Sequence, residues 1–314
     1  MSTRELSHPE TLVVVNERAG AGAMADVFRR TEHPLRDAIG DFDVAFTDYV
    51  GHATELVRDG LESGYRRVVV GGGDGTLNEA VNGWFGADGA PIAPDARMAL
   101  LTGGTGGDFR KTIGVKNRDQ ALAAIVGDRA VPHDVGRVRF RTDAGTEGTR
   151  YFLNIASFGL SGLVDRHIPA YRQLGGRLAY AGATLRSLWG WRNPRVRVVL
   201  DGTQEVSQPV VTVAVANGRY FGGGMEVAPD ASPTDGQFHV AILGDLTRLE
   251  LVMLTQKIYE GRHVEHPKVS TFTARKVFAE AVDHAVYLDV DGEALGGLPA
   301  ELEIVPGALR IVLP

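Results

Sequence analysis

Residues 68–79 constrain the fold of this chain more than any other stretch, because three valines run directly into Gly71-Gly72-Gly73-Asp74-Gly75-Thr76. Consecutive β-branched residues predict a buried strand, and glycines let a backbone approach an anion closely. Thr76 and Asn78 introduce a predicted helix over 77–85, and the free N–H groups and positive dipole end of such a helix attract phosphate. The stretch therefore predicts a strand, a phosphate-binding turn and a helix, in that order.

This glycine-rich turn differs from both common phosphate-binding loops. A Walker loop needs a lysine followed by serine or threonine after its last glycine, and a dinucleotide loop needs a third glycine or an alanine where Asn78 stands. A tight turn alone would explain the glycines, but it would not explain Asp74 among them or the polar Thr76 and Asn78. We therefore interpret the turn as a phosphate site of another kind.

The composition is that of a soluble globular protein: 44% of the 314 residues are hydrophobic, 23% are charged, and the net charge is −6. Because nucleic-acid binding requires a positive surface, we expect no nucleic-acid partner. The absence of cysteine excludes disulfides and thiol chemistry. No signal-peptide pattern is visible, and the longest apolar run, 210–216, is far below the ~18 residues of a membrane helix. These features predict a cytoplasmic protein that can still contact a membrane as a peripheral protein.

Strand and helix signals alternate along the first part of the chain. Apolar runs predict strands at 11–15, 43–46, 68–70 and 98–101, and helical periodicity predicts helices at 24–38, 52–63, 77–85 and 119–126. Such alternation is typical of a parallel sheet with helices on both faces, and ligands of these sheets bind at the carboxyl ends of the strands. We predict an α/β N-terminal domain with a parallel sheet over residues 1–131.

The pattern changes near Pro132 to one strand after another. Short apolar runs predict strands at 135–140, 151–155, 196–200, 210–215, 238–243, 269–274, 277–281, 286–290, 302–305 and 309–313. Regular strands separated by turn residues predict an all-β sandwich over residues 132–314. Two inserted helices are predicted at 178–191 and 247–260, and Thr247 with Glu250 has the spacing of a capping box.

The glycine-rich turn, continued by Leu77-Asn78-Glu79 and Asn82-Gly83, resembles the nucleotide loop of the diacylglycerol kinase and sphingosine kinase family. The NAD kinases share its five-residue core. Two later segments, 221–225 and 228–237, and the acidic sequence Asp291-Gly292-Glu293 also resemble the lipid kinases and distinguish them from NAD kinases. The resemblance implies a nucleotide-binding α/β domain followed by a lipid-substrate β-sandwich domain.

The resemblance also implies which residues bind the nucleotide. The loop after the first predicted strand carries glutamate at 17 and alanine at 19 where the family has proline and serine. The segment 102–109 carries Gly103 in place of a proline and Gly107 in place of an asparagine. Asp74 is expected to position Mg·ATP, a role compatible with capping the helix that follows it. The implied nucleotide-binding residues are Asn16, Gly20, Thr47, Gly72, Gly73, Asp74, Gly75, Thr76, Leu77, Asn78 and Thr105.

Positive side chains near these loops are few, since the chain has only five lysines. Arg18, Arg110 and Lys111 are the candidates to offset phosphate charge. Backbone N–H groups and Mg²⁺ are therefore expected to do most of the neutralising.

The acidic segment Asp291-Gly292-Glu293 follows a predicted strand. Its spacing alone favours a hairpin turn, whereas the resemblance implies a catalytic acid that accepts the proton of a lipid hydroxyl. An alcohol is a poor nucleophile and needs a carboxylate within hydrogen-bond reach. We assign Glu293 as the base, with Asp291 as its close competitor.

A structural Mg²⁺ site is implied at Ser232, Asp235 and Gln237. The family often has a second acid where Thr234 stands, so an ordinary turn remains the alternative.

The segment 186–197 combines four arginines with two tryptophans, which suits the surface of an anionic membrane. A packed helix with a solvated basic end is the alternative. The apolar stripe formed by Leu178, Ala181, Leu185 and Leu188 fits either explanation.

Taken together, the resemblance implies an ATP-dependent lipid kinase that uses Mg²⁺ and transfers the γ-phosphoryl group to a diacylglycerol-like lipid, giving phosphatidic acid for phospholipid biosynthesis. The alternatives are a kinase of another alcohol, such as a sphingoid lipid or NAD, and a degenerate nucleotide-binding regulatory module. The sequence leaves the oligomeric state open, a homodimer included.

Overall fold

The computed structural model describes residues 9–103, 107–174 and 176–314, which form two compact units. The first unit holds residues 9–103, 113–133 and 308–314, and the second holds 107–112 and 134–307. Residues 107–112 belong to the second unit although they lie within the sequence of the first, and residues 308–314 return to the first unit. We predicted a single boundary between residues 131 and 132. The assignment of nucleotide and lipid to the two parts stays a prediction.

The first unit contains a parallel sheet in the order β2-β1-β3-β4, with the end of β17 beside β4. Every residue of β1 and β3 is buried, as expected for parallel strands covered on both faces. The strands are β1 (Thr11–Val15), β2 (Asp43–Phe46), β3 (Arg67–Gly71), β4 (Arg97–Leu101) and β17 (Glu293–Val312).

The helices of this unit are α1 (Ala23–Ile39), α2 (His52–Glu62), α3 (Asp74–Asn82) and α5 (Arg118–Gly127). Helices α2 and α3 pack closely, because a Cβ atom on Gly83 would lie 2.3 Å from the carbonyl oxygen of Thr54. Helix α3 begins three residues before its predicted start, so Asp74 already belongs to its first turn.

The second unit is a β-sandwich. One sheet has the order β14-β13-β10-β7-β16-β17, and the other joins β9, β8, β15, β17, β5 and β6. Apolar side chains from both sheets form the core between them. The remaining strands are β5 (Ala130–Thr142), β6 (Glu147–Phe152), β7 (Ile155–Gly159), β8 (Arg195–Leu200), β9 (Gln204–Pro209), β10 (Thr212–Ala216), β13 (Phe238–Leu243), β14 (Val269–Ala274), β15 (Lys276–Ala281) and β16 (Tyr287–Val290), with a small hairpin of β11 (Tyr220–Phe221) and β12 (Met225–Glu226).

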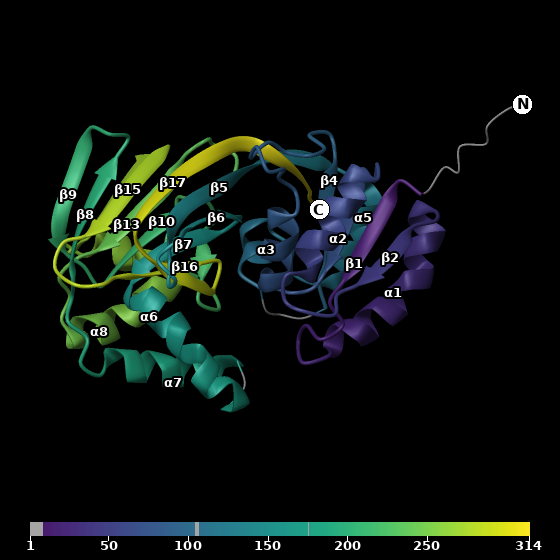
Figure 1. Ribbon diagram of the computed structural model, residues 1–314. Helices are drawn as coiled ribbons and strands as arrows, with labels where there is room; N and C mark the ends of the chain where they lie inside the picture. The colour runs from purple at the N-terminus through teal and green to yellow at the C-terminus, as the bar shows by residue number, and fades with distance from the viewer. Residues whose placement is uncertain (1–8, 104–106, 175) are drawn as a thin grey trace, which may run out of the picture. The chain divides into compact units, whose positions relative to one another are not determined.

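Helices cover the outer face of the first of these sheets (Figure 1). Along β10, Val213 and Val215 enter the sandwich core, whereas Ala214 and Ala216 face the helices. Burial on both faces explains why residues 213–216 of this strand are all apolar. The helical elements of the second unit are α4 (Phe109–Thr112), α6 (Leu160–His167), α7 (Gly176–Leu188) and α8 (Arg248–Tyr259), with 3₁₀ turns at Ile168–Leu174 and Arg262–Glu265.

Several details differ from the sequence-based predictions, among them the unpredicted strand β9 and helix α4. Helix α6 was not predicted, and the strands expected at 302–305 and 309–313 are one continuous strand, β17. The strand expected at 151–155 is interrupted between β6 and β7, because Leu153 and Asn154 turn their N–H groups toward an aspartate described below. The predicted capping box is present at the start of α8, where Thr247 accepts from the Glu250 N–H and Glu250 accepts from the Thr247 N–H.

Candidate functional site

The carboxyl ends of the parallel strands bring the predicted nucleotide loops of the first unit to one edge. Val15 pairs with Phe46 on one side and Gly71 on the other, and Gly71 pairs with Leu101. The residues that follow these four strands therefore begin at the same level of the sheet. They include the predicted Asn16, Thr47 and Gly72.

Direct contacts join two of these loops. The Asn16 side-chain amide donates to Thr76 Oγ1 at 3.0 Å, and the Asn16 backbone N–H donates to the Gly71 carbonyl at 2.8 Å. A Cβ atom on Gly72 would lie 2.5 Å from Thr76 Cβ, so the close approach of Thr76 requires glycine there. The first loop and the glycine-rich turn thus form a single surface.

The start of helix α3 follows this turn. Gly73 is the N-terminal boundary residue, with an extended backbone and no side-chain hydrogen bond capping the helix. The first N–H groups of a helix have no intrahelical acceptors, and they point along the axis with the positive end of the dipole. Asp74 is the first helical residue rather than the cap that we considered, and its carboxylate lies in the first turn.

In the segment 102–109, local packing and backbone conformation explain why glycine stands at 103 and 107 instead of the proline and asparagine of the family. A Cβ atom on Gly103 would lie 2.4 Å from Val27 Cγ2, so a proline would not fit in this packing. Gly107 has φ +103°, a conformation that favours glycine over asparagine. The predicted nucleotide-binding residue Thr105 lies outside the described residues.

The residues after this loop belong to the second unit. Asp108 accepts from Lys111 Nζ at 2.9 Å and from the Gly223 N–H at 2.8 Å. Lys111, which we considered for phosphate charge, is therefore already paired. Arg18 is exposed in the first unit and donates to the Asp48 carbonyl. Arg18 and Lys111 thus belong to different units.

The acidic segment of the second unit forms a two-residue hairpin turn between β16 and β17. Asp291 and Gly292 have φ of +49° and +86°, as a type I′ turn requires. The Asp291 carboxylate accepts three backbone N–H bonds, from Leu153 at 2.9 Å, Asn154 at 3.0 Å and Ile155 at 2.9 Å. This acid therefore ties the turn to the interrupted strand.

Glu293 is held differently. Its Oε2 accepts a single hydrogen bond from Arg150 Nη2 at 2.5 Å, and 28% of its side chain is exposed. Arg150 was not predicted, and no local sequence signal marks it, because 143 residues separate the partners. The two predicted acids thus differ in their partners, since Glu293 accepts from an arginine side chain and Asp291 from three backbone N–H groups.

Sequence reasoning also missed a pair of buried acids behind this turn. Asp289 lies within β16, accepting from the Gly292 N–H at 2.8 Å and the Ser157 hydroxyl at 3.0 Å. Burial raises the pKa of Asp289 well above its usual range, and the charge of Asp165 raises it further. Burial also raises the pKa of Asp165, whose carboxyl group hydrogen-bonds to Asp289. An aspartate inside a predicted apolar strand was the available signal.

This pair predicts a pH-dependent stability difference. The pKa of Asp289 is higher in the folded state than in the unfolded state. The protonated carboxyl group therefore contributes fully to the free energy of unfolding below the pKa of the unfolded state, and this contribution is lost as the pH rises through the pKa of the folded state. Asp289→Asn retains a carbonyl for the Gly292 N–H and an amide for Asp165. The free energy of unfolding of Asp289→Asn in urea should therefore rise relative to that of wild type as the pH increases from about 4 through the raised folded-state pKa, by at most ~1.4 kcal/mol per pH unit.

The matched variant Asp289→Ala leaves the Gly292 N–H and the Ser157 hydroxyl without this acceptor. It should destabilise the protein by about 1–3 kcal/mol. A difference in the free energy of unfolding between Asp289→Asn and wild type that stays constant with pH would contradict the raised pKa of Asp289.

The predicted metal residues lie in a compact turn. The Asp235 carboxylate accepts from the Gln237 N–H at 3.0 Å and contacts His239 Nε2 at 3.1 Å, while Ser232 Oγ bonds to Thr234. The described residues hold no group of three or more acidic, histidine or cysteine side chains that could bind a metal. Mg²⁺ prefers several oxygen ligands, and this turn offers one carboxylate that already accepts a hydrogen bond. The metal site therefore stays a prediction.

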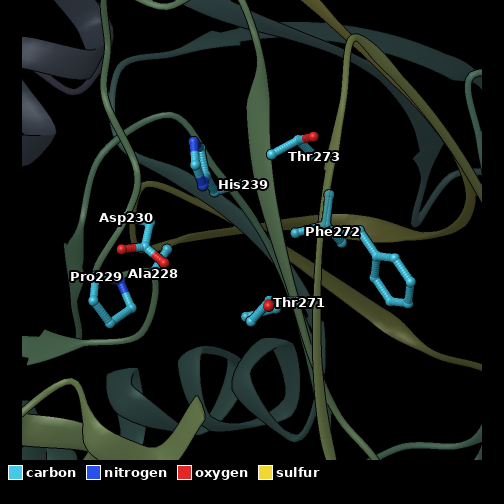
Figure 2. A pocket seen from close by; sticks show the side chains of 9 residues that line it. Ala228, Pro229, Asp230, His239, Thr271, Phe272 and Thr273 are labelled. Atoms are coloured by element: carbon cyan, nitrogen blue, oxygen red, sulfur yellow. The ribbon is translucent and has the colours of Figure 1, made fainter.

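A pocket of about 320 Å³ lies beside this turn. Figure 2 shows Pro229 and Asp230 on one side of it and Thr271 and Thr273 on the other. None of the predicted catalytic acids lines this pocket. It therefore does not mark the place of the predicted chemistry.

Comparison with known proteins identifies the family. Residues 10–138 match the diacylglycerol kinase catalytic domain, and residues 154–313 match the YegS C-terminal NAD kinase beta sandwich-like domain. The chain therefore belongs to the diacylglycerol kinase family of lipid kinases, as its motifs predicted. The predicted fold, an α/β domain with a parallel sheet followed by a β-sandwich, is confirmed as well.

Individual relatives cover most of the chain. The diacylglycerol kinase of Mycobacterium tuberculosis is 31% identical over 83% of this chain and 81% of its own length. A probable lipid kinase YegS-like protein of Chromohalobacter salexigens is 29% identical over 97% of this chain and 93% of its own. A crystal structure from Bacillus anthracis, assigned to the diacylglycerol kinases, superimposes with a TM-score of 0.77 at 24% identity, covering 100% of this chain and 99% of that one.

Proposed function

We propose that this protein transfers the γ-phosphoryl group of ATP, with Mg²⁺, to the hydroxyl of a diacylglycerol-like lipid, giving a phosphatidic acid. The observation that carries the proposal is the common edge of the parallel strands, where Asn16 contacts Thr76 beside the uncapped start of α3. This edge supplies backbone N–H donors to a triphosphate without a lysine. The domain match and the names of the relatives support the lipid as acceptor.

The nucleotide is proposed to lie on the loops after β1, β2, β3 and β4. Gly73 and Gly75 leave space for phosphate oxygens, since a Cβ atom on either glycine would meet no protein atom within 4 Å. Asp74, in the first turn of α3, is proposed to orient the metal–nucleotide complex. When bound, Mg²⁺ would neutralise charge on the β- and γ-phosphates. No step of the proposed reaction uses a metal ion at Asp235.

Glu293 is proposed to accept the proton of the lipid hydroxyl. The hydroxyl oxygen forms a bond to the γ-phosphorus, the bond from that phosphorus to the β-phosphate oxygen breaks, and ADP leaves. Asp291 is a positioning residue in this scheme, because its three N–H bonds fix the turn that presents Glu293. The step requires the Glu293 carboxylate to come within hydrogen-bond distance of the attacking hydroxyl.

A diacylglycerol resides in a bilayer, so the proposal includes a cytoplasmic protein that contacts a membrane surface. No helix within the described residues is long and apolar enough to cross a membrane.

The competing functions are phosphorylation of a sphingoid lipid, phosphorylation of NAD, and a purely regulatory nucleotide-binding role. A homodimer is the alternative to a monomer.

The experiment that tests this function is transfer of radiolabel from ATP. The protein is incubated with Mg²⁺ and labelled ATP together with diacylglycerol, sphingosine, NAD or water alone, and the labelled products are separated. We expect label in phosphatidic acid. Label in sphingosine phosphate or NADP would assign another alcohol, and ATP binding without any transfer would favour the regulatory role.

A further inference from the structure

Helix α7 presents an apolar stripe to solvent rather than to the core. Leu178 and Leu185 are 66% and 72% exposed, and their spacing of seven residues places them on one helical face. Trp189, directly after the helix, is 89% exposed. The face packed against the apolar cluster of this unit includes Tyr180, Ala183 and Leu188, and Ala179 and Ser187 are buried as well. Leu178 and Leu185 of the predicted stripe are therefore exposed, whereas Leu188 of the same stripe packs against the apolar cluster of this unit.

Helix α8 repeats this arrangement. Leu249, Val252 and Met253 are each between 62% and 69% exposed, at the spacing of one helical face. The opposite face buries Leu254 and Ile258. Exposed large apolar side chains on a soluble protein are usually scattered, so two such stripes need an explanation.

The two stripes belong to one surface. Figure 1 shows α7 and α8 on the same side of the strands of the second unit, and residues of both helices pack into the same apolar cluster. The end of α7 is tied to the start of α8, because Arg248 donates to the Trp191 carbonyl at 3.3 Å and Asn193 donates to the Leu246 carbonyl at 2.9 Å. We refer to Leu178, Leu185, Trp189, Leu249, Val252 and Met253 as the α7–α8 surface.

Positive charge accompanies the α7–α8 surface. Arg186, Arg192, Arg248 and Lys257 are exposed, and within the described part of the chain no ion pair neutralises them. The acid nearest to the start of α8, Glu250, is paired with Lys268 at 2.8 Å. A symmetric dimer through this surface would bring the same cations toward their copies, whereas anionic lipid headgroups would neutralise them.

We propose that the α7–α8 surface docks on an anionic lipid bilayer, with both helices lying in its interface. Tryptophan and aliphatic side chains enter the boundary between headgroups and acyl chains, and the arginines and lysine contact the phosphates. This inference rests on the proposed function, because a kinase of bilayer lipids must stay at the surface that holds its substrate.

The test measures binding to vesicles that contain no diacylglycerol. The full-length protein is sedimented with phosphatidylcholine vesicles, with or without about one third phosphatidylglycerol. We expect the wild-type protein to bind the anionic vesicles. The triple variant Leu185→Gln, Trp189→Gln, Leu249→Gln should lose about ten-fold or more in partitioning onto them. Arg186→Gln and Arg192→Gln should each lower this partitioning by about five-fold. Val282→Gln, which alters an exposed valine of the same unit outside α7 and α8, should bind like wild type.

Two further measurements separate this inference from the proposed function. Phosphoryl transfer to short-chain diacylglycerol in detergent micelles should be unchanged in the triple variant, since no bilayer is needed there. Absence of wild-type binding, or equal binding by the triple variant, would overturn the docking surface even if diacylglycerol is phosphorylated. Analytical ultracentrifugation showing that the triple substitution converts a dimer to a monomer would overturn it in favour of a second copy.

Discussion

Replacing Glu293 with glutamine is expected to lower kcat for lipid phosphorylation by about 10²–10⁴-fold. Glutamine keeps the shape of the side chain and an oxygen for Arg150, but it cannot accept the proton of the attacking hydroxyl. The ion pair with Arg150 is partly exposed, so its loss should change Tm little. Initial rates with labelled ATP and dispersed diacylglycerol, measured beside thermal unfolding, check both expectations.

Asp291→Asn serves as the comparison. An asparagine amide in place of one carboxylate oxygen would face a backbone N–H of residues 153–155, so this variant should lose about 1–3 kcal/mol of stability together with activity. If Glu293→Gln retains full kcat while a well-folded Asp291→Asn has none, the base is Asp291 instead.

Gly75→Ala is expected to weaken ATP binding by about ten-fold or more while raising stability. The added Cβ atom meets no protein atom within 4 Å, and alanine is favoured over glycine in a helix by about 0.5–1 kcal/mol. A triphosphate held against this turn would instead collide with the methyl group, at a cost typical of overpacking. Calorimetric titration with Mg·ATP and thermal unfolding measure the two opposite effects.

Gly127→Ala provides the matched control. Gly127 ends helix α5 in the same unit, and a Cβ atom there also meets nothing within 4 Å. It should share any gain in stability but leave ATP affinity unchanged. An unaltered ATP affinity in Gly75→Ala would remove the main support for the glycine-rich turn as the phosphate site.

Much of the first unit could be predicted from its sequence because its signals are local. Strand β2 begins and ends at the predicted residues, and α1 lies within one residue of its prediction at both ends. Helical periodicity, glycine turns and the capping box of α8 each depend on neighbours a few residues apart. The motifs of the predicted nucleotide loops could be recognised for the same reason, because each consists of residues close together in the sequence.

Other features could not be predicted because they depend on distant partners. The interruption between β6 and β7 follows from Asp291, which lies more than 130 residues away. The raised pKa values of Asp165 and Asp289 arise from burial, which no local pattern encodes. The periodicity of α7 showed that Leu178 and Leu185 share a face, yet it could not show which face is packed.

The sequence by itself determined the strand-turn-helix order at residues 67–82, the two architectures and the family, because periodicity and glycine placement act over short distances. Only the tertiary structure decided that Asp291 is bound by three N–H groups whereas Glu293 keeps one arginine partner. It alone decided that α7 packs through residues such as Ala183 and Leu188 and leaves Leu178 and Leu185 in solvent. The physical reason is that burial and hydrogen-bond partners are set by segments far apart in the chain, after the local elements have formed.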